Sequence, residues 1–329
     1  HLGRNNDDYR GAAKLDRIQL QVYKDSDAIK RALATSEVNA ASDIPVLTAN
    51  EVNTQRYRVE NQPVNSGVYA LLNTSSATLQ DVKVRQALQL ATDTVAIRGS
   101  ISKNLPELHL PFINGQITGD VPAAPVVDKQ KAATLLEEAG WVLDGSVRKK
   151  DGQALTIAAV TTKNPDFEKA LDILAKQWRD LGVTVTTNIV NPDDPNQNVA
   201  QDVLQSRQYD VLLYQLAIGA DPDVYAYWHG SQATNGYNFS NYKSAMSDDA
   251  LSTARTRVEP DLRNAKYLTF ARQWMTDVPA IGLYQSTAQY IHTSSVQGPS
   301  AQVPLISSGD RYGTVRYWTV GSESVLKTP

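Results

Sequence analysis

Residues 155–190 read LTIAAVTTKNPDFEKALDILAKQWRDLGVTVTTNIV, and this stretch decides the class of fold. An alternating apolar strand is followed by a helix over Pro165–Leu181 and by a β-branched strand over Val183–Val190. The helix carries an apolar stripe at helical spacing, made by Phe167, Leu171, Leu174, Trp178 and Leu181. Gly182 ends it. We therefore expect a strand–helix–strand unit in an α/β layer with mostly parallel neighbours.

The rest of the chain continues this alternation. Residues 104–127 are rich in proline and glycine and are expected to form a loop. Asp151-Gly152 suits the tight turn of a hairpin. The other expected elements are a strand at 17–23, a helix at 26–36, strands at 56–61 and 68–73, helices from 128, at 199–206, 248–256 and 260–277, and strands at 209–214, 281–284 and 312–318.

The composition limits the class of protein. With 329 residues, 41% hydrophobic and 20% charged, the chain is expected to be globular and divided into subdomains. A net charge of −3 gives no support for nucleic-acid binding. The absence of cysteine excludes thiolate metal sites and disulfides. No apolar run approaches the roughly 20 residues of a membrane span, and no signal peptide is expected in this sequence.

The residue types that are typical of catalysis do not form a recognisable catalytic motif in this sequence. The histidines lie far apart in sequence and share no ligand spacing, so no metal or cofactor is expected. Ser231, in "HGSQ", stands beside a histidine like a nucleophile, but no acid or oxyanion hole accompanies it in the sequence. The acidic pairs Asp193-Asp194 and Asp25/Asp27 are better explained as caps than as cation ligands.

One segment, residues 209–251, combines a strand end with many aromatic residues. After Tyr214 the chain turns through Gly219 and Asp221, and then presents the aromatic and amide side chains Tyr225, Tyr227, Trp228, Tyr237, Asn238 and Tyr242. Ligands of open α/β layers lie beyond the carboxyl ends of strands, where such groups suit a flexible polar ligand. A buried aromatic cluster with Asp221 as a helix cap explains the same spacing equally well.

Residues 81–97, DVKVRQALQLATDTVAI, read as two helices capped by Asp81 and Asp93, and they closely resemble a signature of one family. This family comprises the extracellular solute-binding proteins of peptide/nickel-type ABC importers. Residues 6–11 (NDDYRG), 128–141 (DKQKAATLLEEAGW) and 220–230 (ADPDVYAYWHG) are similar to other passages of the family, in the same order. Arg10 and Asn39 depart from its pattern.

The resemblance implies the type II periplasmic-binding-protein fold, whose two lobes enclose a ligand. The chain then looks like the C-terminal part of such a protein. Residues 1–43 would be a remnant of the first lobe, residues 44–290 a second α/β lobe with a mixed sheet flanked by helices, and residues 291–329 a segment returning to the first lobe. Apolar surface left uncovered near the N-terminus would permit self-association.

The resemblance also implies where a ligand would bind. An asparagine ends the strand before the signature helix, and the strand after "YDVLL" offers backbone groups to peptides. Ile218 occupies a position where peptide-binding members commonly have an aspartate, which puts recognition of a free amino group in doubt. Because strand ends should meet at one edge, the expected ligand-facing residues are Asn73, Tyr214, Gln215, Leu216, Ala217, Ile218, Asp221, Tyr225, Trp228 and Asn238.

The expected function is therefore solute capture for an ABC importer, with a peptide or other small polar solute as ligand and the importer permease as partner. Nucleic acid is not an expected partner. The expected location is extracytoplasmic, as a cell-surface lipoprotein or periplasmic protein. Two alternatives stay open at this point: a hydrolase that uses Ser231 or an acidic pair, and a signalling receptor of the same fold.

Overall fold

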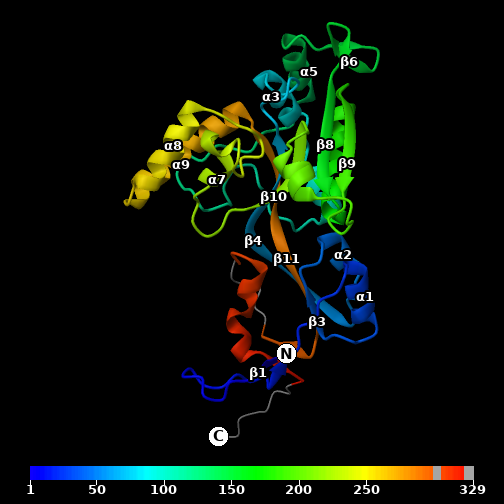
Figure 1. The fold of residues 1–329 in the computed structure, drawn as a ribbon, viewed down its shortest axis with the longest axis vertical. Coiled ribbons are helices and arrows are strands. Elements are labelled where there is room, and N and C mark those ends of the chain that lie inside the picture. The colour runs from blue at the N-terminus through cyan, green and yellow to red at the C-terminus, as the bar shows by residue number, and fades with distance from the viewer. Residues whose placement is uncertain (299–304, 322–329) are drawn as a thin grey trace. The chain divides into compact units, whose positions relative to one another are not determined.

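The computed structural model describes residues 1–298 and 305–321, and these form two compact units (Figure 1). Unit 1 comprises His1–Asn65 and Thr287–Pro329, and unit 2 comprises Ser66–Ser286. The boundaries expected from sequence, 43/44 and 290/291, differ from these. The reason is that β4 (Tyr57–Leu72) and β11 (Ala280–Thr293) are long continuous strands, each with residues in both units.

Unit 2 is built on a mixed sheet with the strand order β11-β4-β10-β8-β9. β8 (Thr156–Thr162) runs parallel to both β9 (Thr184–Val190) and β10 (Val211–Ala217), whereas β10 runs antiparallel to β4. The expected strand–helix–strand unit is thus confirmed as β8, α6 (Pro165–Arg179) and β9. Gly182 adopts a left-handed conformation (φ 91°) just beyond α6, where a residue with a Cβ atom would be strained.

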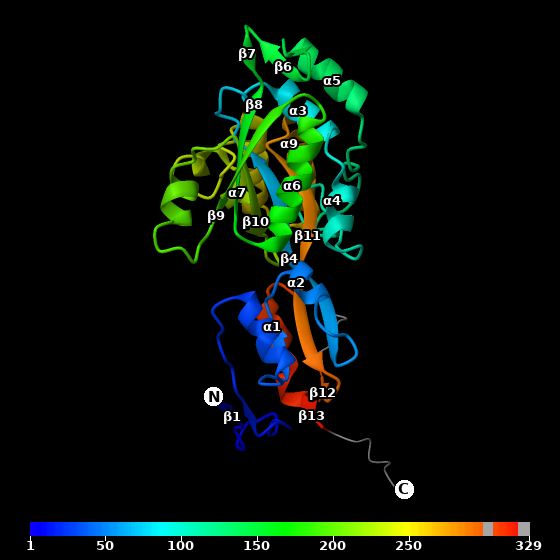
Figure 2. The ribbon, with the colours of Figure 1, turned by 90° about the vertical axis from the view of Figure 1, so that its right-hand side faces the viewer.

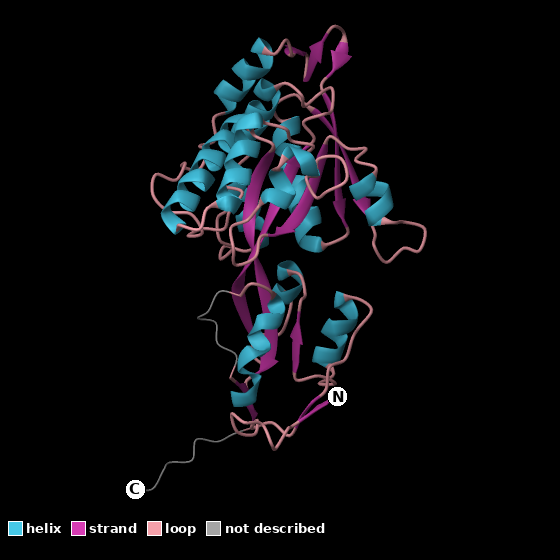
Figure 3. Ribbon diagram, turned by 60° about the vertical axis from the view of Figure 1, so that its left-hand side comes forward, coloured by secondary structure: helices cyan, strands magenta, loops and turns pink. Residues whose placement is uncertain are grey.

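Helices cover both faces of this sheet (Figures 2 and 3). On one face, α6 buries Leu171, Leu174 and the fully enclosed Trp178 of the predicted stripe. Phe167 is half-buried, and Leu181 lies just beyond the end of the helix. The Trp178 indole N–H donates to Thr92 Oγ1 (3.0 Å) and to the Leu88 carbonyl (3.2 Å), which fixes α6 against the end of α3. The caps predicted for α3 (Val82–Leu90) and α4 (Thr94–Ile101) are confirmed. The N–H of Lys83 donates to Asp81 (2.8 Å), and that of Ala96 donates to Asp93 (2.9 Å).

The other face carries α8 (Ala245–Thr256) and α9 (Pro260–Asp277). Their apolar sides share a core with alternate residues of β4 and β10. Tyr69, Trp228 and Trp274 meet edge-to-face at the centre of this core, with ring centroids 5.4–6.5 Å apart. Unit 2 also contains α5 (Lys129–Glu138), β5 (Val142–Asp144), β6 (Val147–Lys150), β7 (Gln153–Ala154), the π-helix η1 (Val199–Gln205), α7 (Tyr225–Trp228) and the 3₁₀-helix η2 (Gly230–Gln232).

Unit 1 has a smaller core beside the C-terminal part of β11, residues 287–293. Tyr290 of β11 pairs with Ser42 of β3 (Ala40–Ser42), and Leu33, Tyr57 and Ile291 pack together. The Tyr57 hydroxyl donates to the Leu33 carbonyl (2.5 Å). The further elements are β1 (Leu2–Gly3), β2 (Arg17–Ile18), α1 (Ser26–Ala34), α2 (Val46–Asn50), β12 (Val296–Gln297), the 3₁₀-helix η3 (Ser308–Tyr317) and β13 (Thr319–Val320).

Four expected strands are wrong in extent or type. Residues 56–61 and 68–73 form the single strand β4, because Pro63 lies beyond the last β4–β10 pair, Ser66–Ala217, and its missing N–H removes no bond of that ladder. The strand expected at 312–318 is largely the helix η3, which starts with a capping box between Ser307 and Asp310. The strand expected at 17–23 is limited to β2.

Candidate functional site

The carboxyl end of β10 is paired on one side only. β4 pairs with β10 over its whole length, from Val211 to Ala217. Within the described residues, pairing with β8 stops at Leu213–Thr161. The second half of β10, Tyr214–Ala217, therefore has an edge that β8 does not cover. An edge of this kind can accept an extended polypeptide.

The register determines which backbone groups face this edge. The Asn73 N–H donates to the Asp210 carbonyl (2.8 Å), and the Thr161 hydroxyl donates to the Leu213 carbonyl (2.9 Å). Because direction alternates along an antiparallel ladder, the N–H and C=O groups of Gln215 and Ala217 point away from β4. The Ala217 carbonyl accepts a hydrogen bond from the Tyr227 hydroxyl (2.5 Å). Gln215 and Ala217 are exposed, so their backbone lies within reach of solvent.

Aromatic rings flank this edge. Tyr214 is half-buried and packs edge-to-face on Phe239 (6.0 Å). Tyr225 is stacked on His229, with ring centroids 4.1 Å apart, and the Arg255 guanidinium lies 3.9 Å from its centroid. Tyrosine is neutral near pH 7 in any case, and burial raises the pKa of Tyr227 further. Trp228 is only 1% exposed and belongs to the core, as do Leu216 and Ile218, so these three side chains present little surface to a ligand.

The carboxylates near this edge are already paired. Asp221 makes a bidentate contact with Arg263 (2.6 and 2.9 Å). Asp223 accepts a hydrogen bond from Arg255 (2.8 Å). A ligand at Tyr214–Ala217 would thus meet neutral backbone groups and aromatic rings, with the nearby negative charges balanced by guanidinium groups.

Two expected ligand-facing residues, Asn73 and Asn238, lie elsewhere. Because β4 and β10 are antiparallel, Asn73 stands at the Val211 end of β10, opposite to the Ala217 end. The two ends of β10 are six residue steps apart, a distance of about 20 Å. The expectation that these strand ends meet at one edge is therefore wrong.

The side-chain amides of Asn73 and Asn238 both form hydrogen bonds within the protein. The Asn73 amide nitrogen donates to the Tyr209 carbonyl (2.9 Å), and its oxygen accepts from Ser75 Oγ (2.7 Å). Asn238 is fully buried, and its amide nitrogen donates to the His229 (3.1 Å) and Tyr242 (2.8 Å) carbonyls. These contacts fix the turns around each residue.

Ser231 lies beside His229 in η2 without the rest of a catalytic triad. His229 Nδ1 lies 2.9 Å from Ser231 Oγ and accepts from the Ser231 backbone N–H (3.1 Å). The other ring nitrogen faces the Ser252 hydroxyl at 3.1 Å, where a triad would place a carboxylate. The nearby carboxylate, Asp248, instead accepts from the Gly230 N–H (2.7 Å). This arrangement caps a helical turn.

The acidic pairs also have structural roles. Asp25 caps α1 by accepting from the Ala28 N–H (2.8 Å), as predicted. Asp194 accepts from the Asn196 N–H (2.9 Å) and so stabilises a turn rather than a helix. In the described ranges, no three His, Asp or Glu side chains gather closely enough to hold a metal ion. Among the helices described, none is both long enough and apolar enough to cross a membrane.

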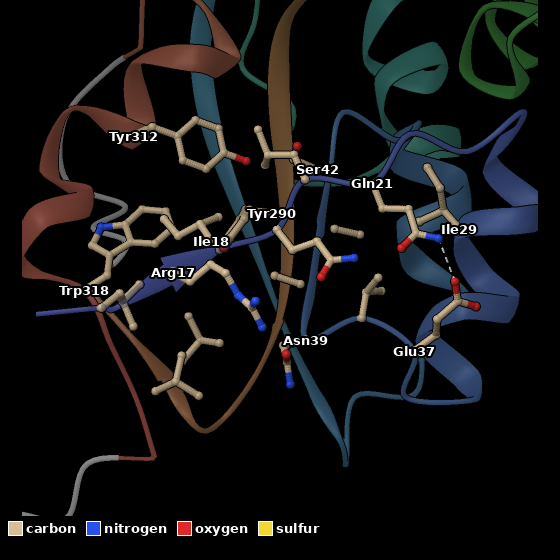
Figure 4. A pocket seen from close by; sticks show the side chains of 18 of the residues that line it. Arg17, Ile18, Gln21, Ile29, Glu37, Asn39, Ser42, Tyr290, Tyr312 and Trp318 are labelled. Carbon is tan, nitrogen blue, oxygen red and sulfur yellow. Dashed lines mark hydrogen bonds between the residues drawn. The ribbon is translucent and has the colours of Figure 1, made fainter. Parts of the chain in front are cut away.

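Unit 1 contains a pocket of about 450 Å³ that sequence reasoning missed (Figure 4). Tyr290, Tyr312 and Trp318 line one part of it, and the Gln21 amide donates to Glu37 (2.8 Å) in another. These residues come from segments nearly 300 positions apart in the chain. Within the strand expected at 17–23, the apolar residues Ile18, Leu20 and Val22 alternate with polar ones, and this is the local sequence signal for the region. Two of these apolar side chains stay uncovered, since Leu20 is 62% and Val22 95% exposed.

Known proteins similar to this chain bind solutes. The oligopeptide-binding protein AppA of Bacillus subtilis is 26% identical over 310 residues, which cover 90% of this chain and 55% of AppA. The structure of AppA in complex with a nonapeptide matches with a TM-score of 0.78 and 21% identity, over 97% of this chain and 63% of that one. CtaP of Listeria monocytogenes, an ABC-transporter substrate-binding protein, matches with a TM-score of 0.82 and 22% identity, over the same shares.

These structural matches show that the chain has the type II periplasmic-binding-protein fold, as expected. The chain spans about half to two thirds of the length of these relatives. The family model described as "bacterial extracellular solute-binding proteins, family 5 Middle" matches residues 2–238, well over half of the chain. The chain therefore belongs to the bacterial extracellular solute-binding proteins, family 5.

Proposed function

We propose that this chain captures an extended peptide, or a solute with a similar backbone, at the free edge of Tyr214–Ala217. The observation that carries the proposal is the one-sided pairing of β10 beyond Leu213. A peptide at this edge would extend the sheet and would bond to the N–H and C=O of Gln215 and to the N–H of Ala217. The same class of ligand is supported by the relative AppA, an oligopeptide-binding protein whose structure is known with a nonapeptide.

Selection at this edge would depend on backbone geometry and shape. Main-chain hydrogen bonds are common to all peptides, and the rings of Tyr214, Tyr225 and Tyr227 would pack on apolar side chains of the ligand. Asp221 is held by Arg263, and Ile218 has a hydrocarbon side chain, so neither provides a free carboxylate for an α-amino group. We infer that a free amino terminus contributes little to binding. The other expected ligand-facing residues lie outside this edge, because Leu216 and Trp228 belong to the core and Asn73 and Asn238 hold turns of the chain.

Within an importer, this binding would deliver the solute to the membrane. We propose an ABC-importer permease as the partner and an extracytoplasmic location, either periplasmic or anchored as a lipoprotein. We propose no enzymatic role, because His229 and Ser231 lack the carboxylate of a triad. These proposals rest on membership of the solute-binding family.

We also propose self-association through unit 1. No strand pairs with the backbone of Gln19–Tyr23 in the described part of the chain. An antiparallel pairing of two copies centred on Leu20 would place Ile18 of each copy opposite Val22 of the other. All of the apolar side chains would then share one face, which is the isologous arrangement that a twofold dimer requires.

The test of peptide capture changes one backbone donor. Gln215→Pro removes the N–H that faces the free edge but no N–H that pairs with β4, and Gln215→Ala keeps the backbone as a matched control. Binding of a library of nonapeptides, measured calorimetrically, should weaken about fivefold or more in the proline variant, because one hydrogen bond to the ligand is lost. The alanine variant should stay within about twofold of the original protein.

Three outcomes decide the matter. Unchanged affinity in Gln215→Pro, with an unchanged circular dichroism spectrum, would exclude the edge as the binding site. Equal losses in both variants would mean that the side chain, rather than the backbone, contacts the ligand. Cleavage products from the same library would contradict a purely binding role.

A further inference from the structure

Unit 2 has a second pocket, of about 710 Å³, at the opposite end of β10 from the proposed peptide edge. Thr74 and Ser75, which follow β4, line it together with Arg207, which precedes β10. Two further cations, Arg85 and Lys243, also line the pocket, and Asp277 is the only carboxylate among its described lining residues. The pocket therefore concentrates positive charge in a chain whose net charge is −3.

Arg85 brings a buried charge to this pocket. It is only 6% exposed, and its guanidinium donates to the backbone carbonyls of Leu79 (2.7 Å), Gln80 (3.0 Å) and Asp277 (2.6 Å). Desolvation lowers its pKa, with partial compensation from the charge of Asp277. Carbonyl oxygens satisfy the N–H groups but neutralise no charge. A bound anion would supply the missing compensation.

Arg207, which is half-buried, also brings a positive charge to this pocket. Its guanidinium donates to the carbonyls of Ala233, Gly236 (2.7 Å) and Asn238 (2.8 Å), and so it holds the loop before α8. Its buried Nε–H has no hydrogen-bond partner among the described residues. Desolvation lowers its pKa as well. Within the described part of the chain, neither Arg85 nor Arg207 forms an ion pair with a carboxylate.

Lys243 and the start of α8 complete the positive lining. The Lys243 side chain is exposed, and no ion pair involves it in the ranges that the structure describes. The next residue, Ser244, caps α8, a helix of 12 residues whose amino terminus carries partial positive charge. Free N–H groups at such a terminus bind oxyanions readily when cations stand beside them.

The single carboxylate of the pocket is already engaged. Asp277 Oδ2 accepts from the Tyr242 hydroxyl (2.5 Å) and from the Gln273 amide (2.9 Å). Three cations against one carboxylate leave two positive charges uncompensated. We propose that this pocket binds a small multivalent oxyanion, a phosphate or a di- or tricarboxylate, with Lys243 as its mobile cationic contact. This site would be independent of peptide capture.

Lys243→Gln tests the proposal without disturbing the fold, because Lys243 is exposed, whereas the two arginines hold loops in place. Lys103→Gln is the matched control, since Lys103 is also exposed and lies outside the pocket. Inorganic phosphate and citrate would be titrated calorimetrically at constant ionic strength, with chloride as the reference anion. We expect Lys243→Gln to weaken binding of the preferred oxyanion about tenfold, and Lys103→Gln to leave it unchanged.

The comparison of the two anions shows which kind of oxyanion the pocket prefers. Tighter binding of phosphate indicates a phosphorylated ligand, and tighter binding of citrate indicates a carboxylate ligand. Absence of heat with both anions would overturn the proposal, and so would equal binding by the Lys243 and Lys103 variants. Nonapeptide affinity should be the same in both variants, so failure at this pocket would not count against the peptide edge.

Discussion

Trp178 is the residue whose truncation should most clearly test the core of unit 2. Its side chain is enclosed by the protein, with 0% of its surface accessible, and its indole N–H donates to Thr92 and Leu88. Trp178→Ala removes a large buried ring and leaves a cavity, which costs about 3–5 kcal/mol. The lost hydrogen bonds contribute about 1 kcal/mol of this at most, because the Thr92 hydroxyl still donates to the Leu88 carbonyl (2.7 Å).

Urea denaturation followed by circular dichroism measures this loss as a lower midpoint with an unchanged slope. For a unit the size of Ser66–Ser286, the melting temperature should fall by roughly 6–20 °C. Trp178→Phe is the control that keeps an aromatic ring but loses the N–H, and it should be destabilised much less. A loss below about 1 kcal/mol in Trp178→Ala would refute the assignment of this face of α6 to the core.

Two further predictions concern unit 1 and the tyrosines. In sedimentation velocity at high micromolar concentration, the protein should dimerise, Val22→Lys should be monomeric, and the control Val126→Lys, at a site 80% exposed in unit 2, should still dimerise; a monomeric original protein would exclude the proposed pairing. Burial raises the pKa of Tyr69 and Tyr284 in the folded state, while unfolded tyrosine keeps a pKa of about 10. The folded state thus holds these protons more tightly, so its stability should be complete below about pH 10 and fall as the pH rises further. Urea midpoints at about pH 9 and 11 measure this, and equal midpoints would contradict it.

Elements defined by local patterns could be predicted from the sequence. The stripe of α6, the caps Asp81 and Asp93 and the turn at Gly182 each depend on residues within about one or two helical turns of each other. The Asp151-Gly152 turn is equally local, and both residues adopt positive φ angles (51° and 78°) as expected.

The arrangement of the site could not be predicted in the same way. Whether Asn73 and Ala217 share an edge depends on the direction in which β4 runs beside β10, and these strands are far apart in sequence. Strand direction is set by tertiary contacts, which leave no periodic signal in either segment. The free edge at Gln215 likewise depends on where β8 ends. The charged pocket unites Arg85, Arg207 and Lys243 from three separate segments, so no motif marks it.

The pairing of Asp221 with Arg263 and of Asp223 with Arg255 has a consequence for the speed of ligand capture. Each pair forms a compact dipole whose field decays quickly with distance, so these groups neither attract nor repel an approaching solute from afar. Encounter at the β10 edge is then limited by random diffusion and by the orientation of the incoming chain. These groups would therefore favour an association rate that changes little with ionic strength, and affinity would be set by how long the solute stays.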